Sequence, residues 1–151
     1  MPDELAELLD TAIYKEISSQ AVYIAGQKKT QDHAAKTLMK ELAVEEFGHS
    51  QRLKGFKEKG WQEKDWHREQ VPNLMLSEYL TGPDAIERTG LQETLILAMK
   101  REQQAIEFYS KMMGIMRDEP SKRLCQRLVH EELKHKLSLE TFYDDLFYSE
   151  D

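Results

Sequence analysis

The sequence predicts an all-α protein: a four-helix bundle of two antiparallel helical hairpins joined by a long crossover. Apolar residues recur at intervals of three and four over long stretches, with almost no β-branched alternation. Only four prolines interrupt the 151 residues. The chain also matches itself without a gap when it is shifted by 86 residues. We therefore expect one domain, residues 1–151, in which two similar hairpins face each other.

The first hairpin is predicted from residues 3–28 and 31–59. Both segments carry an apolar stripe at helical spacing, formed by Leu5, Leu9, Ile13, Leu38, Leu42 and Leu53. A short polar stretch between the two segments predicts a tight turn. Gly60 is expected to end the second helix, because glycine commonly follows the last helical residue.

The second hairpin is predicted from residues 91–117 and 120–147, with Pro120 near the start of its second helix. Residues 60–90 lack a clear period and contain Pro72, Pro83 and three glycines. A connection of this length is expected when the chain must travel the length of a bundle before the next helix begins.

Composition excludes several classes of protein. A formal charge of −7 argues against nucleic acid as a partner, because binding to phosphates needs a basic surface. No apolar run approaches the ~20 residues of a membrane helix. The N-terminal residues lack the features of a signal peptide, so we expect a cytoplasmic protein. Cys125 is the only cysteine, which excludes a disulfide framework and a thiolate metal site.

The polar matches of the repeat indicate a site. Glu16 aligns with Glu102, and in the same register two Glu-x-x-His motifs align, namely Glu46 with Glu132 and His49 with His135. A shared need for an apolar core explains matched leucines, but it gives no reason to repeat glutamate and histidine. A single Glu-x-x-His usually means a surface ion pair. Two of them, in register with two more glutamates, favour a functional cluster.

Helical geometry brings these six residues to one level. Glutamate and histidine three positions apart project from the same helix face. Each hairpin turns midway between its two glutamates, so that both glutamates lie at the same height. Four buried carboxylates without compensation would cost more than the net stability of a domain. Two divalent cations balance them, and oxygen and nitrogen ligands suit iron or manganese.

Other polar residues have simpler interpretations. Tyr23 and Tyr109 also align, and they are expected either to donate hydrogen bonds to the ligands or to be ordinary core tyrosines. Glu45 and Glu131 point about 100° from the ligand face and are expected in solvent. The histidines outside the repeat are expected at the surface: His33, His67 and His130. The clustered methionines are expected to fill the core: Met112, Met113 and Met116.

At these residues the chain resembles the rubrerythrin-type diiron domain of the ferritin-like superfamily. The matching segments are KEISSQAVY, LAVEEFGHSQRL, AMKREQQAIEFY and LVHEELKHKLSLE. The resemblance implies a ferritin-like bundle with two iron ions, manganese being possible at one or both positions. It implies that Glu16 and Glu102 are terminal ligands and that Glu46 and Glu132 bridge the metals. His49 and His135 would bind one ion each.

The chain departs from the family pattern in two respects. Full-length rubrerythrins add a rubredoxin-like domain with four cysteines, which this chain cannot form, so a separate donor such as rubredoxin would supply electrons. They also usually carry a further glutamate three residues after the ligand of the third helix, where this chain has Ala105. The remaining symmetric set of six ligands is closer to the pattern of bacterioferritin.

The resemblance implies a diiron oxidoreductase that reduces hydrogen peroxide or oxygen in two-electron steps. A ferroxidase that handles iron is the first alternative, and a diiron monooxygenase or hydroxylase is the second. A metal-dependent binding module without catalytic activity is the third. We expect a homodimer or a higher homo-oligomer, with no nucleic acid or membrane partner.

Overall fold

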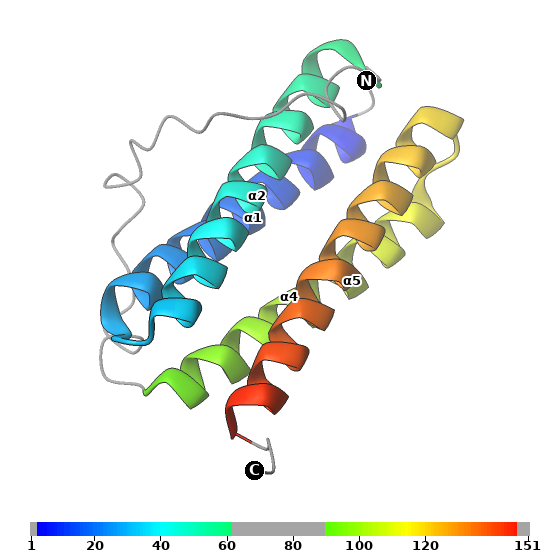
Figure 1. Cartoon of the computed structure of the whole chain (residues 1–151). Helices are drawn as coiled ribbons and strands as arrows, with labels where there is room; N and C mark the ends of the chain where they lie inside the picture. The colour runs from blue at the N-terminus through cyan, green and yellow to red at the C-terminus, as the bar shows by residue number, and fades with distance from the viewer. Residues whose placement is uncertain (1–2, 62–89, 148–151) are drawn as a thin grey trace.

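The computed structural model describes residues 3–61 and 90–147, which form four helices (Figure 1). They are α1 (Asp3–Lys29), α2 (His33–Lys59), α4 (Leu91–Ile115) and α5 (Glu119–Phe147). Helices α1 and α2 form one antiparallel hairpin, and α4 and α5 form the other, with α1 packed beside α4. The all-α four-helix bundle predicted from the sequence is confirmed.

Each helix begins and ends within two residues of its predicted bounds, because the local signals at the ends are strong. The side chain of Asp32 accepts a hydrogen bond from the Ala35 backbone N–H at 2.8 Å and thereby caps α2. Gly60 ends α2 with a φ of 74°, a conformation that favours glycine. Asp118 accepts hydrogen bonds from the N–H and hydroxyl of Ser121 at the start of α5. The predicted crossover lies largely outside the described residues.

The core is divided along the bundle axis into two apolar clusters, and all four helices contribute side chains to each. One cluster contains Leu9, Ala12, Leu53, Phe56, Tyr109, Met112, Met116, Leu124, Cys125 and Leu128. The other contains Tyr23, Ile24, Met39, Leu42, Ala43, Leu95, Ala98 and Leu139. Between them lies a layer of buried polar side chains at mid-helix. The apolar clusters supply the favourable burial that the polar layer cannot.

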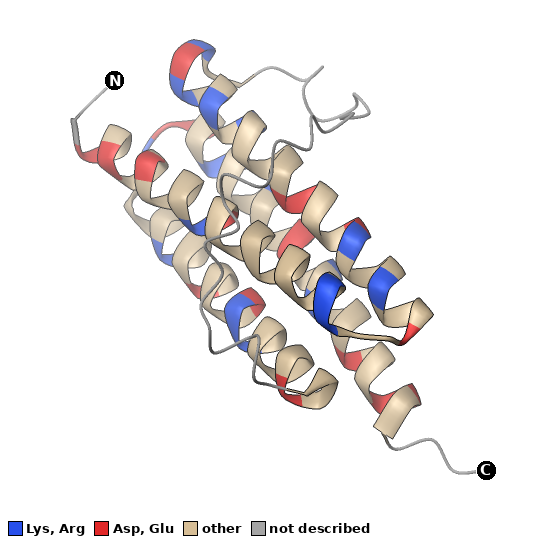
Figure 2. Cartoon of the chain, turned by 90° about the vertical axis from the view of Figure 1, so that its left-hand side faces the viewer, with Lys and Arg blue, Asp and Glu red and all other residues tan. Residues whose placement is uncertain are grey.

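The outer faces of the helices carry many charged residues, although Tyr14 and Leu137 are exposed hydrophobic side chains. Basic and acidic residues are interspersed along the helices, without a large region of one sign in the view of Figure 2. Within residues 3–61 and 90–147 no helix combines the length and the apolar character that a membrane crossing requires.

The cap of α2 gives a first prediction. Replacing Asp32 by alanine removes the acceptor for the Ala35 N–H, and the free energy of unfolding should fall by about 1 kcal/mol. Gln31→Ala, at the exposed neighbouring position, is the matched control and should change the stability by less than about 0.5 kcal/mol. Urea unfolding followed by circular dichroism measures both variants. Equal stability of the two would show that the cap is not formed.

Candidate metal centre

The six residues singled out by the repeat lie together in the polar layer. Glu16 comes from α1, Glu46 and His49 come from α2, Glu102 comes from α4, and Glu132 and His135 come from α5. Each is at most 2% exposed. The helices therefore bring all six together at the level that the spacing predicted.

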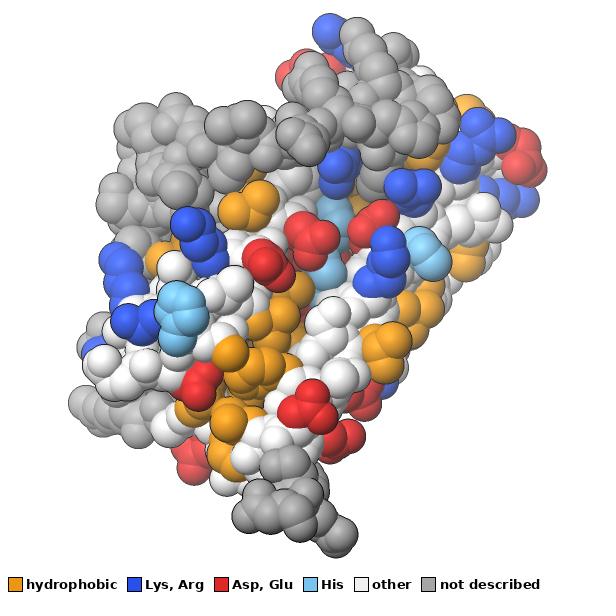
Figure 3. Space-filling model, viewed as in Figure 1, with side chains coloured by type: hydrophobic (Ala, Val, Ile, Leu, Met, Phe, Trp, Pro, Cys, Tyr) orange, Lys and Arg blue, Asp and Glu red, His pale blue; other side chains and the backbone are white. Residues whose placement is uncertain are grey.

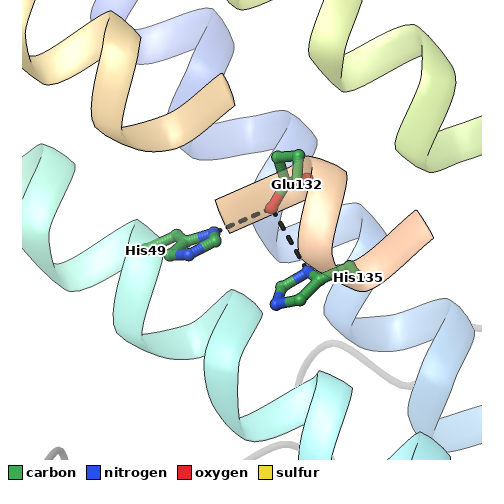
Figure 4. A group of neighbouring side chains, drawn as sticks. All are labelled: His49, Glu132 and His135. Carbon is green, nitrogen blue, oxygen red and sulfur yellow. Dashed lines mark ion pairs between the residues drawn. The ribbon is translucent and has the colours of Figure 1, made fainter. Parts of the chain in front are cut away.

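The two histidines face each other across the centre (Figure 4). Their rings stack with centroids 5.4 Å apart and planes 13° apart. Glu132 Oε1 lies between them, 3.0 Å from His49 Nδ1 and 3.3 Å from His135 Nδ1. Glu46 Oε1 also faces both rings, at 2.7 Å from His135 Nδ1 and 3.7 Å from His49 Nδ1. Two carboxylates thus lie between two imidazoles.

The other two carboxylates each face one imidazole. Glu16 Oε2 lies 3.4 Å from His49 Nδ1, and Glu102 Oε1 lies 3.6 Å from His135 Nδ1. Each also accepts a hydrogen bond from a tyrosine of the opposite hairpin: Tyr109 donates to Glu16 at 2.6 Å, and Tyr23 donates to Glu102. Two interpretations of these aligned tyrosines were open from the sequence. The structure supports the first, because both tyrosines donate hydrogen bonds directly to cluster glutamates.

Glu45 is exposed, as expected, but it also contacts the cluster. Its side chain is 53% exposed, but its Oε2 atom lies 2.8 Å from His135 Nε2, the ring nitrogen that faces away from the cluster. This pairing lowers the pKa of Glu45. The carboxylate reaches the ring because α2 and α5 face each other at this height. Its counterpart Glu131 is only 16% exposed and pairs with Arg127 at 3.3 Å, so the expectation of a solvated position is wrong for Glu131.

Buried charge shifts the protonation of the cluster. Burial alone would lower the pKa of His49, but the carboxylates of Glu16 and Glu132 outweigh it and raise that pKa to about 10. Burial, followed by the charge of Glu132, raises the pKa of Glu102 to about 8. Burial and the neighbouring carboxylates likewise raise the pKa of Glu46. Glu132 is also buried, yet the two histidines that face its carboxylate lower its pKa. Protons held on some of these groups balance the charge of the others.

The same atoms fit a pair of metal ions. Two groups of four residues each offer ligand atoms within 4.8 Å of one another: one contains Glu16 and His49, the other contains Glu102 and His135, and both contain Glu46 and Glu132. The Nδ1 atoms of both histidines have no properly aligned hydrogen-bond partner, and at least one oxygen of each glutamate also lacks one. A bound cation requires ligand atoms that are buried, point to a common centre and are not engaged in hydrogen bonds.

One buried side chain near the cluster was not assigned a role from the sequence. Gln20, one helical turn after Glu16, is fully buried, and neither atom of its amide has a hydrogen-bond partner. The equivalent position of the second hairpin is Ile106, which is apolar. The only available signal was this glutamine on an otherwise apolar stripe, and it was weak because nothing in the repeat matched it.

The described histidines outside the repeat and the clustered methionines lie where they were expected. His33 and His130 are exposed, as expected, and His67 lies outside the described residues. Met112 and Met116 are buried in the apolar core, with Met113 packed against them. On the face between α2 and α5, hydrophobic side chains follow the seam and histidine atoms are visible near its middle (Figure 3).

Comparisons with known proteins agree with this architecture. The model of the rubrerythrin family matches residues 7–143. No curated protein matches the chain. A solved structure of a hypothetical protein from Pyrococcus furiosus superposes with a TM-score of 0.68 at 25% identity, over 93% of this chain and 88% of that chain.

The protonation of the cluster predicts how stability depends on pH in the metal-free protein. The pKa values of His49 and Glu102 are raised on folding, to about 10 and about 8. A raised pKa contributes stability that is present below the pKa of the unfolded chain and is lost as the pH rises to the folded value. The melting temperature should therefore fall between about pH 4.5 and pH 10, because Glu102 contributes to the fall up to about pH 8 and His49 contributes to it above about pH 6.5.

Circular dichroism melts of metal-free protein across this range test the expectation. Glu102→Gln is the informative variant, because it removes a titrating group and should flatten the part of the fall below about pH 8. Stability that rises with pH over the same range would contradict the assignment of protons to the cluster.

Gln20 gives a separate prediction. Gln20→Leu removes two buried, unpaired polar atoms with little change in shape, so the metal-free protein should unfold with a free energy higher by about 1 kcal/mol or more. Ile106→Leu, at the equivalent position, is the control for shape and should cost less than about 1.5 kcal/mol. A loss of stability in Gln20→Leu would mean that the amide contributes to the fold itself.

Proposed function

The chain belongs to the rubrerythrin family, and from that premise we propose that it is a diiron oxidoreductase. The proposed reaction is the two-electron reduction of hydrogen peroxide or oxygen at a carboxylate-bridged pair of iron ions. Electrons would come from a separate protein.

The observation that carries this proposal is the overlap of the two ligand groups. Each group offers three carboxylates and one imidazole, and the two groups share Glu46 and Glu132. The proposed terminal ligands are Glu16 with His49 on one ion and Glu102 with His135 on the other. Four carboxylates balance two divalent ions, while the mixture of oxygen and nitrogen donors suits iron or manganese.

A bound diferrous pair would supply two electrons and a Lewis-acidic template. The protein would supply positioning and proton-bearing groups. Tyr23 and Tyr109 hold Glu102 and Glu16 by hydrogen bonds from opposite hairpins. Burial first, and then the adjacent carboxylates, raise the pKa values of both tyrosines, so that their hydroxyls keep their protons at neutral pH.

The apolar clusters above and below the layer would restrict water at the reacting centre. Glu45 would orient one ligand, because its carboxylate pairs with the outward nitrogen of His135 and leaves Nδ1 directed at the centre. A carboxylate on the far side of a ligating imidazole fixes the ring orientation and increases its basicity.

The electron donor is proposed to be a separate redox protein such as rubredoxin, because the single cysteine cannot form a four-thiolate iron site. That cysteine, Cys125, lies within an apolar cluster, where burial raises the pKa of its thiol to about 12. It is therefore poorly suited to thiolate redox chemistry.

A second candidate function is ferroxidase activity in iron handling, and one observation favours it. Ala105, which packs against one of the apolar clusters, stands where rubrerythrins usually carry a further glutamate, so six ligands remain in a symmetric arrangement. Storage would require a large assembly. Size-exclusion chromatography separates the two candidates, since a monomer or dimer eliminates storage.

The proposal is tested by loading the protein with ferrous iron without oxygen. We expect two iron ions per chain and, on rapid mixing with hydrogen peroxide, oxidation faster than that of free ferrous iron. Glu46→Gln removes a shared ligand and should lower the iron content to one ion or fewer. Glu41→Gln, an exposed position on the same helix, is the matched control and should retain two ions.

Oxidation no faster than that of free iron would rule out the peroxidase reaction. Fast oxidation by oxygen together with slow oxidation by peroxide would favour the ferroxidase candidate. A protein that takes up no iron under these conditions would overturn both.

A further inference from the structure

A small pocket opens between α1 and α4 beside the carboxylate of Glu16. Its volume is about 40 Å³, room for about three water-sized groups. Its lining includes Lys15, Glu16, Ser19, Arg101, Ala105 and Tyr109. The pocket therefore reaches from the surface seam of two helices to a predicted metal ligand.

Two cations from opposite hairpins line this pocket. Lys15 and Arg101 occupy equivalent positions of the repeat, each directly before a cluster glutamate. Because α1 and α4 are antiparallel neighbours, equivalent residues next to Glu16 and Glu102 come close across their seam. Arg101 is partly held, since its Nη2 donates to Ser18 Oγ at 2.6 Å. Its Nε atom is buried and has no hydrogen-bond partner. A buried, unpaired guanidinium N–H is costly unless an acceptor completes it.

The space exists because two small side chains occupy the next pair of equivalent positions. Ser19 on α1 corresponds to Ala105 on α4 in the repeat, and both line the pocket. Ser19 is 8% exposed and offers a hydroxyl. On the inner side, Glu16 Oε1 is already bonded to Tyr109. Donors therefore outnumber acceptors around a volume of three or four heavy atoms.

We propose that this pocket binds a small planar anion of the carboxylate type, with three or four heavy atoms. The Arg101 guanidinium offers the planar N–H donors that match such an anion, and Lys15 adds a second positive charge at the rim. The anion would lie at the outer side of Glu16, next to the metal position that Glu16 and His49 would form.

The anion site depends on the proposed metal pair in one respect. The carboxylate of Glu16 repels an anion unless a cation beside it balances its charge. Metal loading should therefore strengthen anion binding, and the anion should strengthen metal binding by the same factor, because such coupling is reciprocal.

Formate is the probe. Sodium formate is titrated into diferric protein by isothermal calorimetry, with sodium chloride holding the ionic strength constant. We expect saturable binding at one site per chain, weakened about tenfold or more in Arg101→Met, because a charge-assisted hydrogen bond is lost. Ala105→Leu should abolish binding by filling the volume. Metal-free protein should bind formate more weakly than the diferric form.

The matched control is Lys100→Met, which removes a positive charge from the exposed position next to Arg101 and should leave formate affinity within about twofold. Iron content and circular dichroism are recorded for every variant, so that loss of the fold or of the metal is recognised. If Arg101→Met and Ala105→Leu bind formate as the wild type does, the anion binds elsewhere, for instance on iron. That result would contradict the proposal that the pocket is the anion site.

The two proposals fail separately. A protein without iron overturns the proposed function. Iron-loaded protein that shows no saturable response to formate beyond that to chloride overturns only the anion pocket.

Discussion

The burial of four carboxylates and two imidazoles in one layer is the constraint on which the rest of the structure depends. Four uncompensated negative charges in a core would exceed the net stability of a domain of this size. In the absence of metal, the structure meets this cost with protons, because the pKa values of His49, His135, Glu46 and Glu102 are all raised. Two divalent cations would displace those protons and leave the same side chains in the same layer. The apolar clusters on both sides then have two roles, since they supply the favourable burial energy and keep solvent from screening the layer.

The fold and the composition of the layer could be predicted because both depend on spacing within single helices. A shift of 86 residues aligns Glu16, Glu46 and His49 with their counterparts, and a helix turns a fixed angle per residue. Because each hairpin turns midway between its two glutamates, both glutamates lie at the same height along the bundle. The position of the layer is then determined. The ends of α2 were predictable for a different reason, since Asp32 and Gly60 act on the backbone within three or four residues.

Features that depend on the distance between helices could not be predicted. Glu45 lies about 100° from the ligand face of its own helix, which correctly indicates partial exposure. Its contact with His135 is set by how closely α2 and α5 approach, a quantity that periodicity does not contain. The burial of the Gln20 amide without a hydrogen-bond partner could not be predicted either, because it also depends on how closely the helices approach. The pocket beside Ala105 depends on the absence of side-chain atoms at one point of the α1–α4 seam, and a sequence pattern records only which residues are present.

The repeat makes the six cluster residues equivalent in pairs, but their surroundings are not equivalent. In the repeat, Gln20 aligns with Ile106, and Ser19 aligns with Ala105. The unpaired amide and the cationic pocket therefore both belong to the Glu16 half of the layer, whereas the outer carboxylate Glu45 supports His135 in the other half.

Two metal ions held by matching ligands would consequently differ in hydrogen bonding and in access. A small exogenous ligand would approach the position formed by Glu16 and His49, because the described pocket that reaches the cluster opens there. The position formed by Glu102 and His135 would be held more rigidly. A symmetric ligand set can thus support a directional reaction, because the asymmetry lies in the residues that surround it.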